Sequence, residues 1–134
     1  MSKNTIHIED DPKDRVLVVE DEESLRVALR DKLISEGYHI YTASNGEEGL
    51  KIALKQHPDL ILVDIVMPVM DGMTMIKELR NDDWGKNAKA IFLTNLSDAE
   101  KTAEAVSRGV YDILVKADWR IEDVVKKIKD ELST

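Results

Sequence analysis

The segment 60–64, Leu-Ile-Leu-Val-Asp, places the tightest constraint on how this chain folds. Its four consecutive apolar residues show no alternation with polar ones, so both faces of a strand here must be covered by protein. Such a strand lies inside a parallel sheet that carries helices on both sides. The acid that ends the run, Asp64, is then expected at the carboxyl end of a central strand.

Four further short apolar segments, at 16–19, 39–43, 90–93 and 113–115, have the composition of strands. A helical pattern follows each of the five predicted strands. The first is an apolar stripe at Leu25, Leu29 and Leu33 that stops at Gly37, and the second is opened by Asn45 and Glu48 and broken at Pro58. The third follows Gly72 and is outlined by Met73, Ile76, Lys77 and Leu79, the fourth runs from Ser97 to Gly109, and the last is outlined by Ile121, Val124, Val125, Ile128 and Leu132. Asp118 is expected to cap the last helix. The order is strand–helix five times over, which predicts an α/β fold, a (βα)5 doubly wound parallel five-stranded sheet.

Length and composition fit one domain of this kind. The chain has 134 residues and is 43% hydrophobic, which suffices for one core. We expect a flexible N-terminal extension at 1–14 and a single domain at 15–132. The segment 1–14 lacks the apolar core of a secretion signal, and the chain has no Cys, which excludes disulfides and thiolate sites. We therefore expect a cytoplasmic location.

The charge balance bears on partners. A net charge of −8, from 27 acids and 19 bases, argues against nucleic acid or an anionic membrane surface as a partner. No apolar run approaches the roughly 20 residues that span a bilayer.

Polar residues follow four of the predicted strands at their carboxyl ends. They are Glu20 and Asp21, Asp64, Thr94 and Lys116. Each alone is more often a turn or surface residue, but parallel strands bring all of these ends to one edge of the sheet, where ligand sites of such folds lie. Crowded carboxylates would be stabilised by a hard divalent cation such as Mg²⁺. Asp64 would then act as a nucleophile toward a phosphoryl group, with Lys116 and Thr94 contacting its oxygens.

The sequence resembles the receiver domain of bacterial response regulators. The residues that carry the resemblance are VLVVEDE at 16–22, LILVDIVMPVMDG at 60–72, FLT at 92–94 and LVK at 114–116. The match covers about 15–132, nearly the whole chain. The resemblance implies a flavodoxin-like sheet with strand order 2-1-3-4-5.

The resemblance also implies a role for each site residue. Asp64 would be the phosphoacceptor, and Asp21, Asp64 and the carbonyl of Val66 would bind Mg²⁺, with Glu20 acting through a metal-bound water. Thr94 and Lys116 would contact the phosphoryl group. Met67, Pro68 and Gly72 would shape the loop after the third strand, and Asp71 is interpreted as a turn residue rather than a ligand. A sensor histidine kinase or a histidine phosphotransfer protein would donate the phosphoryl group, a downstream protein would receive the signal, and the domain would be a monomer or weak dimer.

Three positions depart from the family pattern. Glu20 stands where Asp is frequent, a common variant. Ala117 follows Lys116 where the family usually has Pro, and a cis bond before Ala would cost about 3 kcal/mol. Ile113 stands where the family usually has Tyr or Phe, the ring that moves with Thr94 in switching; Tyr111, two residues earlier, would point to the same face.

Two alternatives compete with a switching receiver. Ile113 and Ala117 suggest a receiver that no longer switches and binds its partners constitutively. A phosphatase or phosphotransferase with an aspartyl nucleophile would carry a second Asp two residues after Asp64, but that position is Val66, so turnover of small phosphate esters is not expected. The chain also fits either a natural single-domain protein or the receiver of a longer regulator.

Overall fold

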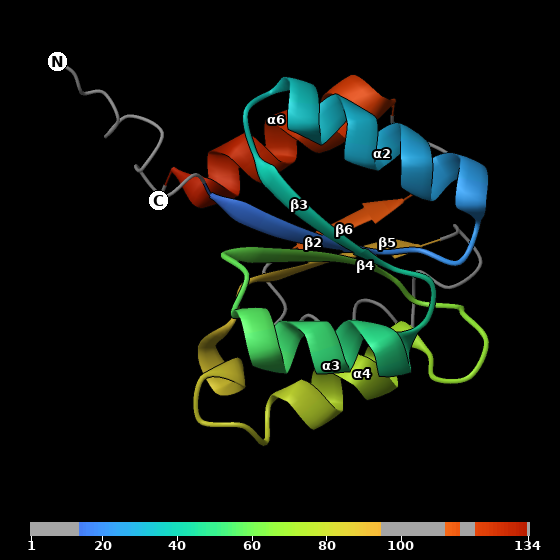
Figure 1. Cartoon of the computed structure of the whole chain (residues 1–134), viewed down its shortest axis with the longest axis vertical. Helices are drawn as coiled ribbons and strands as arrows, with labels where there is room; N and C mark the ends of the chain where they lie inside the picture. The colour runs from blue at the N-terminus through green and yellow to red at the C-terminus, as the bar shows by residue number, and fades with distance from the viewer. Residues whose placement is uncertain (1–13, 95–111, 116–119, 134) are drawn as a thin grey trace, which may run out of the picture.

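The computed structural model describes residues 14–94, 112–115 and 120–133, and its centre is a five-stranded parallel sheet (Figure 1). The strands are β2 (Arg15–Val19), β3 (His39–Ala43), β4 (Leu60–Asp64), β5 (Ala90–Thr94) and β6 (Asp112–Val115). They lie in the order β3-β2-β4-β5-β6. Numbered along the chain, this is 2-1-3-4-5, as predicted.

Four α-helices are described, two on each face of the sheet. They are α2 (Glu23–Ser35), α3 (Gly46–Gln56), α4 (Gly72–Leu79) and α6 (Ile121–Leu132). In Figure 1, α2 and α6 cover one face, and α3 and α4 cover the other. A short 3₁₀-helix, η1 (Gly85–Asn87), lies between α4 and β5. The helix expected from Ser97 to Gly109 lies outside the described residues.

The central strand β4 confirms the reasoning from its composition. All five of its residues are buried, and it pairs with β2 on one side and β5 on the other. Its side chains alternate between two cores. Ile61 and Val63 face the core under α3 and α4, and Leu60 and Leu62 face the core under α2 and α6.

The helix ends explain where the chain turns. Gly37 has a φ of 98°, so a residue without a Cβ suits the turn after α2. The Asn45 side chain accepts a hydrogen bond from the Glu48 N–H at 2.8 Å, as expected of an N-cap. The Glu48 carboxylate in turn accepts from the Ser44 N–H at 2.7 Å, one residue before the cap.

One predicted detail of the helices is wrong. The last helix begins at Ile121 with Arg120 as its N-cap, not Asp118, because the Asp123 carboxylate accepts the Arg120 N–H at 2.8 Å. The helix predicted after Gly72 is confirmed as α4, in which Gly72, Met75, Ile76 and Leu79 are buried and Lys77 is exposed. The charged end of Lys77 therefore stays in water.

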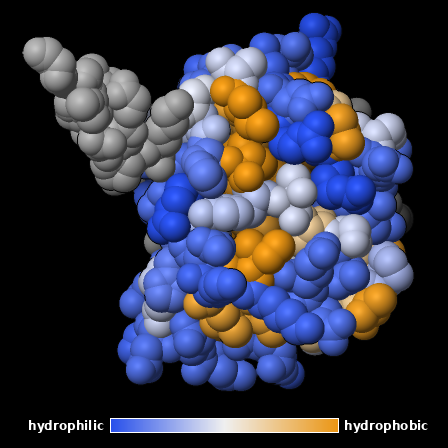
Figure 2. All heavy atoms as spheres, in the orientation of Figure 1, coloured by the Kyte–Doolittle hydropathy of each residue, from blue (hydrophilic) through white to orange (hydrophobic). Residues whose placement is uncertain are grey.

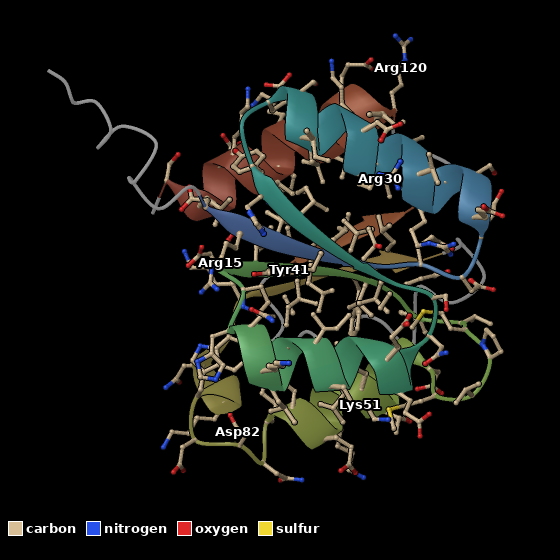
Figure 3. All side chains as sticks on the ribbon, viewed as in Figure 1. Arg15, Arg30, Tyr41, Lys51, Asp82 and Arg120 are labelled. Carbon is tan, nitrogen blue, oxygen red and sulfur yellow. The ribbon has the colours of Figure 1, made fainter. Side chains whose placement is uncertain are left out.

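The end of the molecule opposite the carboxyl ends of the strands is closed by local contacts. The His57 ring stacks on Trp84, with ring centroids 4.3 Å apart and an interplanar angle of 7°. The Arg15 guanidinium donates to the His57 carbonyl at 2.9 Å. Asp82 accepts the N–H groups of Trp84 and Gly85. Figure 3 shows Arg15 and Asp82 at this end of the molecule. The contacts among these residues give this end a structural role.

The face of the molecule drawn in Figure 2 is mostly polar. On the face drawn in Figure 2, apolar residues form small groups among polar ones. No helix within the described segments has the length and apolar character needed to cross a bilayer.

Candidate functional site

Three carboxylates meet at the carboxyl edge of the sheet. Glu20 and Asp21 directly follow β2, and Asp64 is the last residue of β4. Because Val19 pairs with Val63 in these neighbouring parallel strands, the next residues on each strand, Glu20 and Asp64, lie at the same level. One carboxylate oxygen from each acid lies within 4.8 Å of the others. The sequence therefore identified residues that the fold does bring together.

The burial of these acids is graded from the core to the surface. Glu20 is fully buried, Asp64 is 5% exposed, and Asp21 is exposed. The site is thus open to solvent on the side of Asp21 and closed behind Glu20. Like charges this close repel one another, and the repulsion is strong where water is scarce. A hard divalent cation that prefers oxygen ligands fits this set, so the residues present are compatible with Mg²⁺.

The turn after β2 is held by hydrogen bonds to neighbouring elements and to the Glu20 carboxylate. The Glu20 N–H donates to the Ala43 carbonyl at 3.0 Å, and the Glu22 N–H donates to Glu20 Oε2 at the same distance. Arg26, one turn into α2, donates from Nη1 to the carbonyls of Glu20 at 2.9 Å and Asp21 at 3.4 Å. The turn that carries two of the three acids is therefore anchored to β3 and to α2.

The loop after β4 is closed at its neck. The Gly72 N–H, at the start of α4, donates to the Ile65 carbonyl at 2.8 Å. A Cβ on Gly72 would lie 2.1 Å from the Asp64 carbonyl oxygen, so glycine is required for this approach. Asp71 caps α4 by accepting the Thr74 N–H at 2.7 Å. This contact agrees with its interpretation as a turn residue rather than a ligand.

Two valines stand out on this loop. Val66 is 58% exposed and Val69 is 75% exposed, although both are apolar. Val69 also has a φ of 69°, which is unusual for a β-branched residue. The loop backbone, including the Val66 carbonyl predicted as a metal ligand, follows directly on Asp64. The role of that carbonyl stays a prediction.

The other predicted site residues are only partly placed. The backbone of Thr94 ends β5, beside β4, and Ile113 lies in β6 opposite Phe92. Lys116, Tyr111 and Ala117 lie outside the described residues. The roles predicted for Thr94, Lys116, Tyr111 and Ile113 in phosphoryl contact and switching therefore stay predictions.

Sequence reasoning missed two residues that support the site. Arg26 anchors the acidic turn, and Gly46, described below, contacts the loop after β4. In the sequence, Asn45 followed by Gly46 indicated the start of a helix but not the contact between Gly46 and the loop after β4. Nothing in the spacing of Arg26 pointed to the two carbonyls that it binds.

Comparison with known proteins gives a consistent result. The model of the response regulator receiver domain matches residues 16–129. The chain is 37% identical over 117 residues to "Probable transcriptional regulator ycf27" of Guillardia theta, covering 87% of this chain and 45% of that protein. It is 34% identical over 111 residues to "Response regulator PleD" of Caulobacter vibrioides, covering 83% of this chain and 24% of that protein. The chain thus spans about half or less of the length of these relatives.

Solved structures share the fold. The chemotaxis response regulator CheY4 of Vibrio cholerae superposes with a TM-score of 0.81 at 32% identity, covering 89% of this chain and 98% of that one. The receiver domain of sensor histidine kinase PA1611 from Pseudomonas aeruginosa PAO1 gives a TM-score of 0.81 at 24% identity, covering 91% of this chain and 99% of that one. The family model spans most of the chain, and the fold agrees with that of the solved receiver domains. The chain belongs to the response regulator receiver domain family.

Proposed function

We propose that this receiver accepts a phosphoryl group on Asp64 in a Mg²⁺-dependent reaction and signals through protein contacts. The observation that carries the proposal is the convergence of Glu20, Asp21 and Asp64 within 4.8 Å at the open edge of the sheet. Asp64 is buried and ends the central strand β4, whereas Asp21 is exposed to solvent. A donor can therefore approach the nucleophile from the side of Asp21.

The reaction transfers a phosphoryl group between two protein side chains. A carboxylate oxygen of Asp64 attacks phosphorus, the phosphorus–nitrogen bond of a phosphohistidine breaks, and the histidine leaves. Thr94 and Lys116 are proposed to contact the phosphoryl oxygens. When bound, Mg²⁺ would offset the negative charge of the carboxylates and of the transferred group. The chain's own contribution is to hold Asp64 at the end of a strand that is buried along its whole length.

Support for the metal comes from the acids and from one relative. The receiver domain of PA1611 was solved with a magnesium ion coordinated in its active-site cleft. Glu20, Asp21 and Asp64 of this chain offer the oxygen ligands that such an ion prefers. We infer that Asp21, Asp64 and the Val66 carbonyl bind Mg²⁺ directly and that Glu20 acts through a bound water.

The partners are inferred from the family. A sensor histidine kinase or a histidine phosphotransfer protein is the proposed donor, and a downstream protein is the proposed receiver of the signal. Phosphorylation would shift an existing equilibrium between inactive and active conformations. A cytoplasmic location and a monomeric or weakly dimeric state belong to the same proposal.

A non-switching interaction module is the second candidate. The observation that favours it is Ile113, which occupies β6 where the family usually has an aromatic ring. Such a protein would bind its partner equally well with and without a phosphoryl group on Asp64. Partner affinity measured in both states separates the two candidates.

The first test is phosphorylation by a small donor. The protein is incubated with acetyl phosphate and Mg²⁺, and its intact mass is followed over time. We expect one phosphoryl adduct that disappears with a chelator and in Asp64→Asn. Asp83→Asn serves as the matched control, because Asp83 is an exposed loop acid outside the cluster and should leave the adduct unchanged. A folded protein that forms no adduct at any donor concentration would refute the proposal.

A further inference from the structure

Helix α3 begins in direct contact with the loop after β4. The Gly46 N–H, in the first turn of α3, donates to the Met70 carbonyl at 2.9 Å. Gly46 is buried, and Figure 1 shows the start of α3 beside this loop. An N–H in the first turn of a helix has no partner within the helix, and here the loop supplies one. The helix start and the loop are thus joined by their backbones.

The contact is too close for any side chain at residue 46. A Cβ there would lie 2.4 Å from the Met70 carbonyl oxygen and 3.0 Å from the Asp71 carbonyl oxygen. Both atoms belong to the backbone, so neither can rotate away as a side chain would. A residue with a Cβ would therefore push the loop away from the helix.

The loop needs such a restraint because its tip is strained. The Met70 N–H donates to the Pro68 carbonyl at 2.7 Å, which closes a γ-turn around Val69. With its φ of 69°, Val69 adopts the rare form of this turn. Strained residues persist where their surroundings hold them. Two hydrogen bonds do so here, from Gly46 to the Met70 carbonyl and from Gly72 to the Ile65 carbonyl.

These two bonds enclose the segment that contains Val66. Ile65 and Met67 on either side of it are buried, so the backbone between them has little freedom. A shift of Met70 would be transmitted through this short segment to Val66 and toward Asp64. In contrast, a Cβ on Gly49, one turn further along α3, would meet side chains: Val19 at 2.8 Å and Met75 at 3.1 Å.

We propose that Gly46 is a positioning residue for the metal site. It fixes the loop after β4 through the Met70 carbonyl, so that the Val66 carbonyl faces the carboxylates of Asp21 and Asp64. The inference rests on the proposed function, because it assumes that Mg²⁺ binds there. Gly46 itself touches neither the metal nor the phosphoryl group.

The test compares Mg²⁺ affinity in Gly46→Ala and Gly49→Ala. Titration calorimetry with magnesium chloride should show a dissociation constant raised about tenfold in Gly46→Ala, the order of loss typical when a supporting contact of a metal ligand is removed. Gly49→Ala adds the same methyl group to the same helix but presses on the core. It should change the melting temperature and leave the dissociation constant within about twofold of the wild type.

Each outcome has a distinct meaning. If the wild type binds Mg²⁺ and folded Gly46→Ala binds it equally well, the inference about Gly46 is wrong and the proposed function stands. Equal weakening in both variants would also overturn it, because the effect would then be one of general stability. A wild type that binds no Mg²⁺ would overturn both the inference and the metal site of the proposed function.

A second measurement covers the case in which Gly46→Ala does not fold. In the wild type, the Gly46 amide resonance is followed by NMR during titration with Mg²⁺. Coupling between two sites is reciprocal, so metal binding should shift this resonance with the same midpoint as the resonances of Asp64 and Val66. The Lys51 amide, in the second turn of α3, is the internal control. A Gly46 resonance that does not move would refute the inference.

Discussion

Val69 shows at the scale of one residue how the loop after β4 departs from ordinary backbone geometry. Left-handed conformations cost roughly 1–2 kcal/mol for most residues, and Asn tolerates them better than branched residues do. Because the Val69 side chain is 75% exposed, replacing it removes little buried surface. We expect Val69→Asn to raise the free energy of unfolding by about 1 kcal/mol in urea titrations.

The control for this prediction is Val69→Ala. Alanine removes the branch but keeps the Cβ that opposes a positive φ. Val69→Ala should therefore raise the free energy of unfolding by less than Val69→Asn does. If Val69→Asn is no more stable than Val69→Ala, the loop carries no strain that a tolerant residue can relieve.

Single residues also mark the limit of what the sequence predicts. Asp64, Asp21 and Glu20 were identified correctly as neighbours, because strand ends are set by apolar runs that are easy to recognise. Arg26 and Gly46 were not, because their partners are backbone carbonyls brought close by tertiary packing. Such contacts leave no periodic pattern in the sequence.

At the scale of elements, the start of α3 depends on its cap. Asn45 supplies the acceptor for the Glu48 N–H at 2.8 Å. We expect Asn45→Ala to lower the free energy of unfolding by about 1 kcal/mol, as is typical for the loss of such a cap. Glu47→Ala, an exposed change in the same turn, should have a smaller effect. Equal effects in thermal or urea unfolding would show that the Asn45 hydrogen bond contributes nothing specific.

Element boundaries were predicted well where apolar residues define them and poorly where caps do. The strand predicted at 39–43 has the same bounds as β3, and the strand predicted at 90–93 lies within β5. The start of α6 was placed too early, at Asp118, because an Asp suggested a cap there. In the structure the Arg120 N–H donates to the Asp123 carboxylate and the Asp123 N–H donates to the Arg120 carbonyl, so the helix begins at Ile121.

At the scale of the whole molecule, the acidic edge carries part of a net charge of −8. Asp21 places its carboxylate within 4.8 Å of those of the buried acids Glu20 and Asp64. Without a metal ion, the repulsion among the three carboxylates lowers the free energy of unfolding. We expect Asp21→Asn to raise the free energy of unfolding in a chelator by about 1 kcal/mol. The same variant should lose the stabilisation that Mg²⁺ gives the wild type.

Asp83→Asn is the control for this prediction, because it makes the same charge change on a loop away from the cluster. It should leave the Mg²⁺-dependent shift in melting temperature intact. Equal stabilisation by Asp83→Asn and Asp21→Asn would assign the effect to net charge rather than to the acidic site.

The overall architecture was the most predictable property. Strand–helix alternation predicted the α/β class, and the resemblance to receiver domains predicted the strand order that the sheet has. The functional edge was predicted in part. Glu20, Asp21 and Asp64 meet there, whereas the roles of Thr94, Lys116, Tyr111 and Ile113 await experiments that address each of them.

The sheet divides the interior into two separate cores, and this division has an evolutionary consequence. Among the residues that the structure describes, the core under α3 and α4 shares no side chain with the core under α2 and α6, since each strand residue faces one side. A change in one core therefore needs few compensating changes in the other. Lineages can rebuild the two halves independently while the strand ends stay fixed.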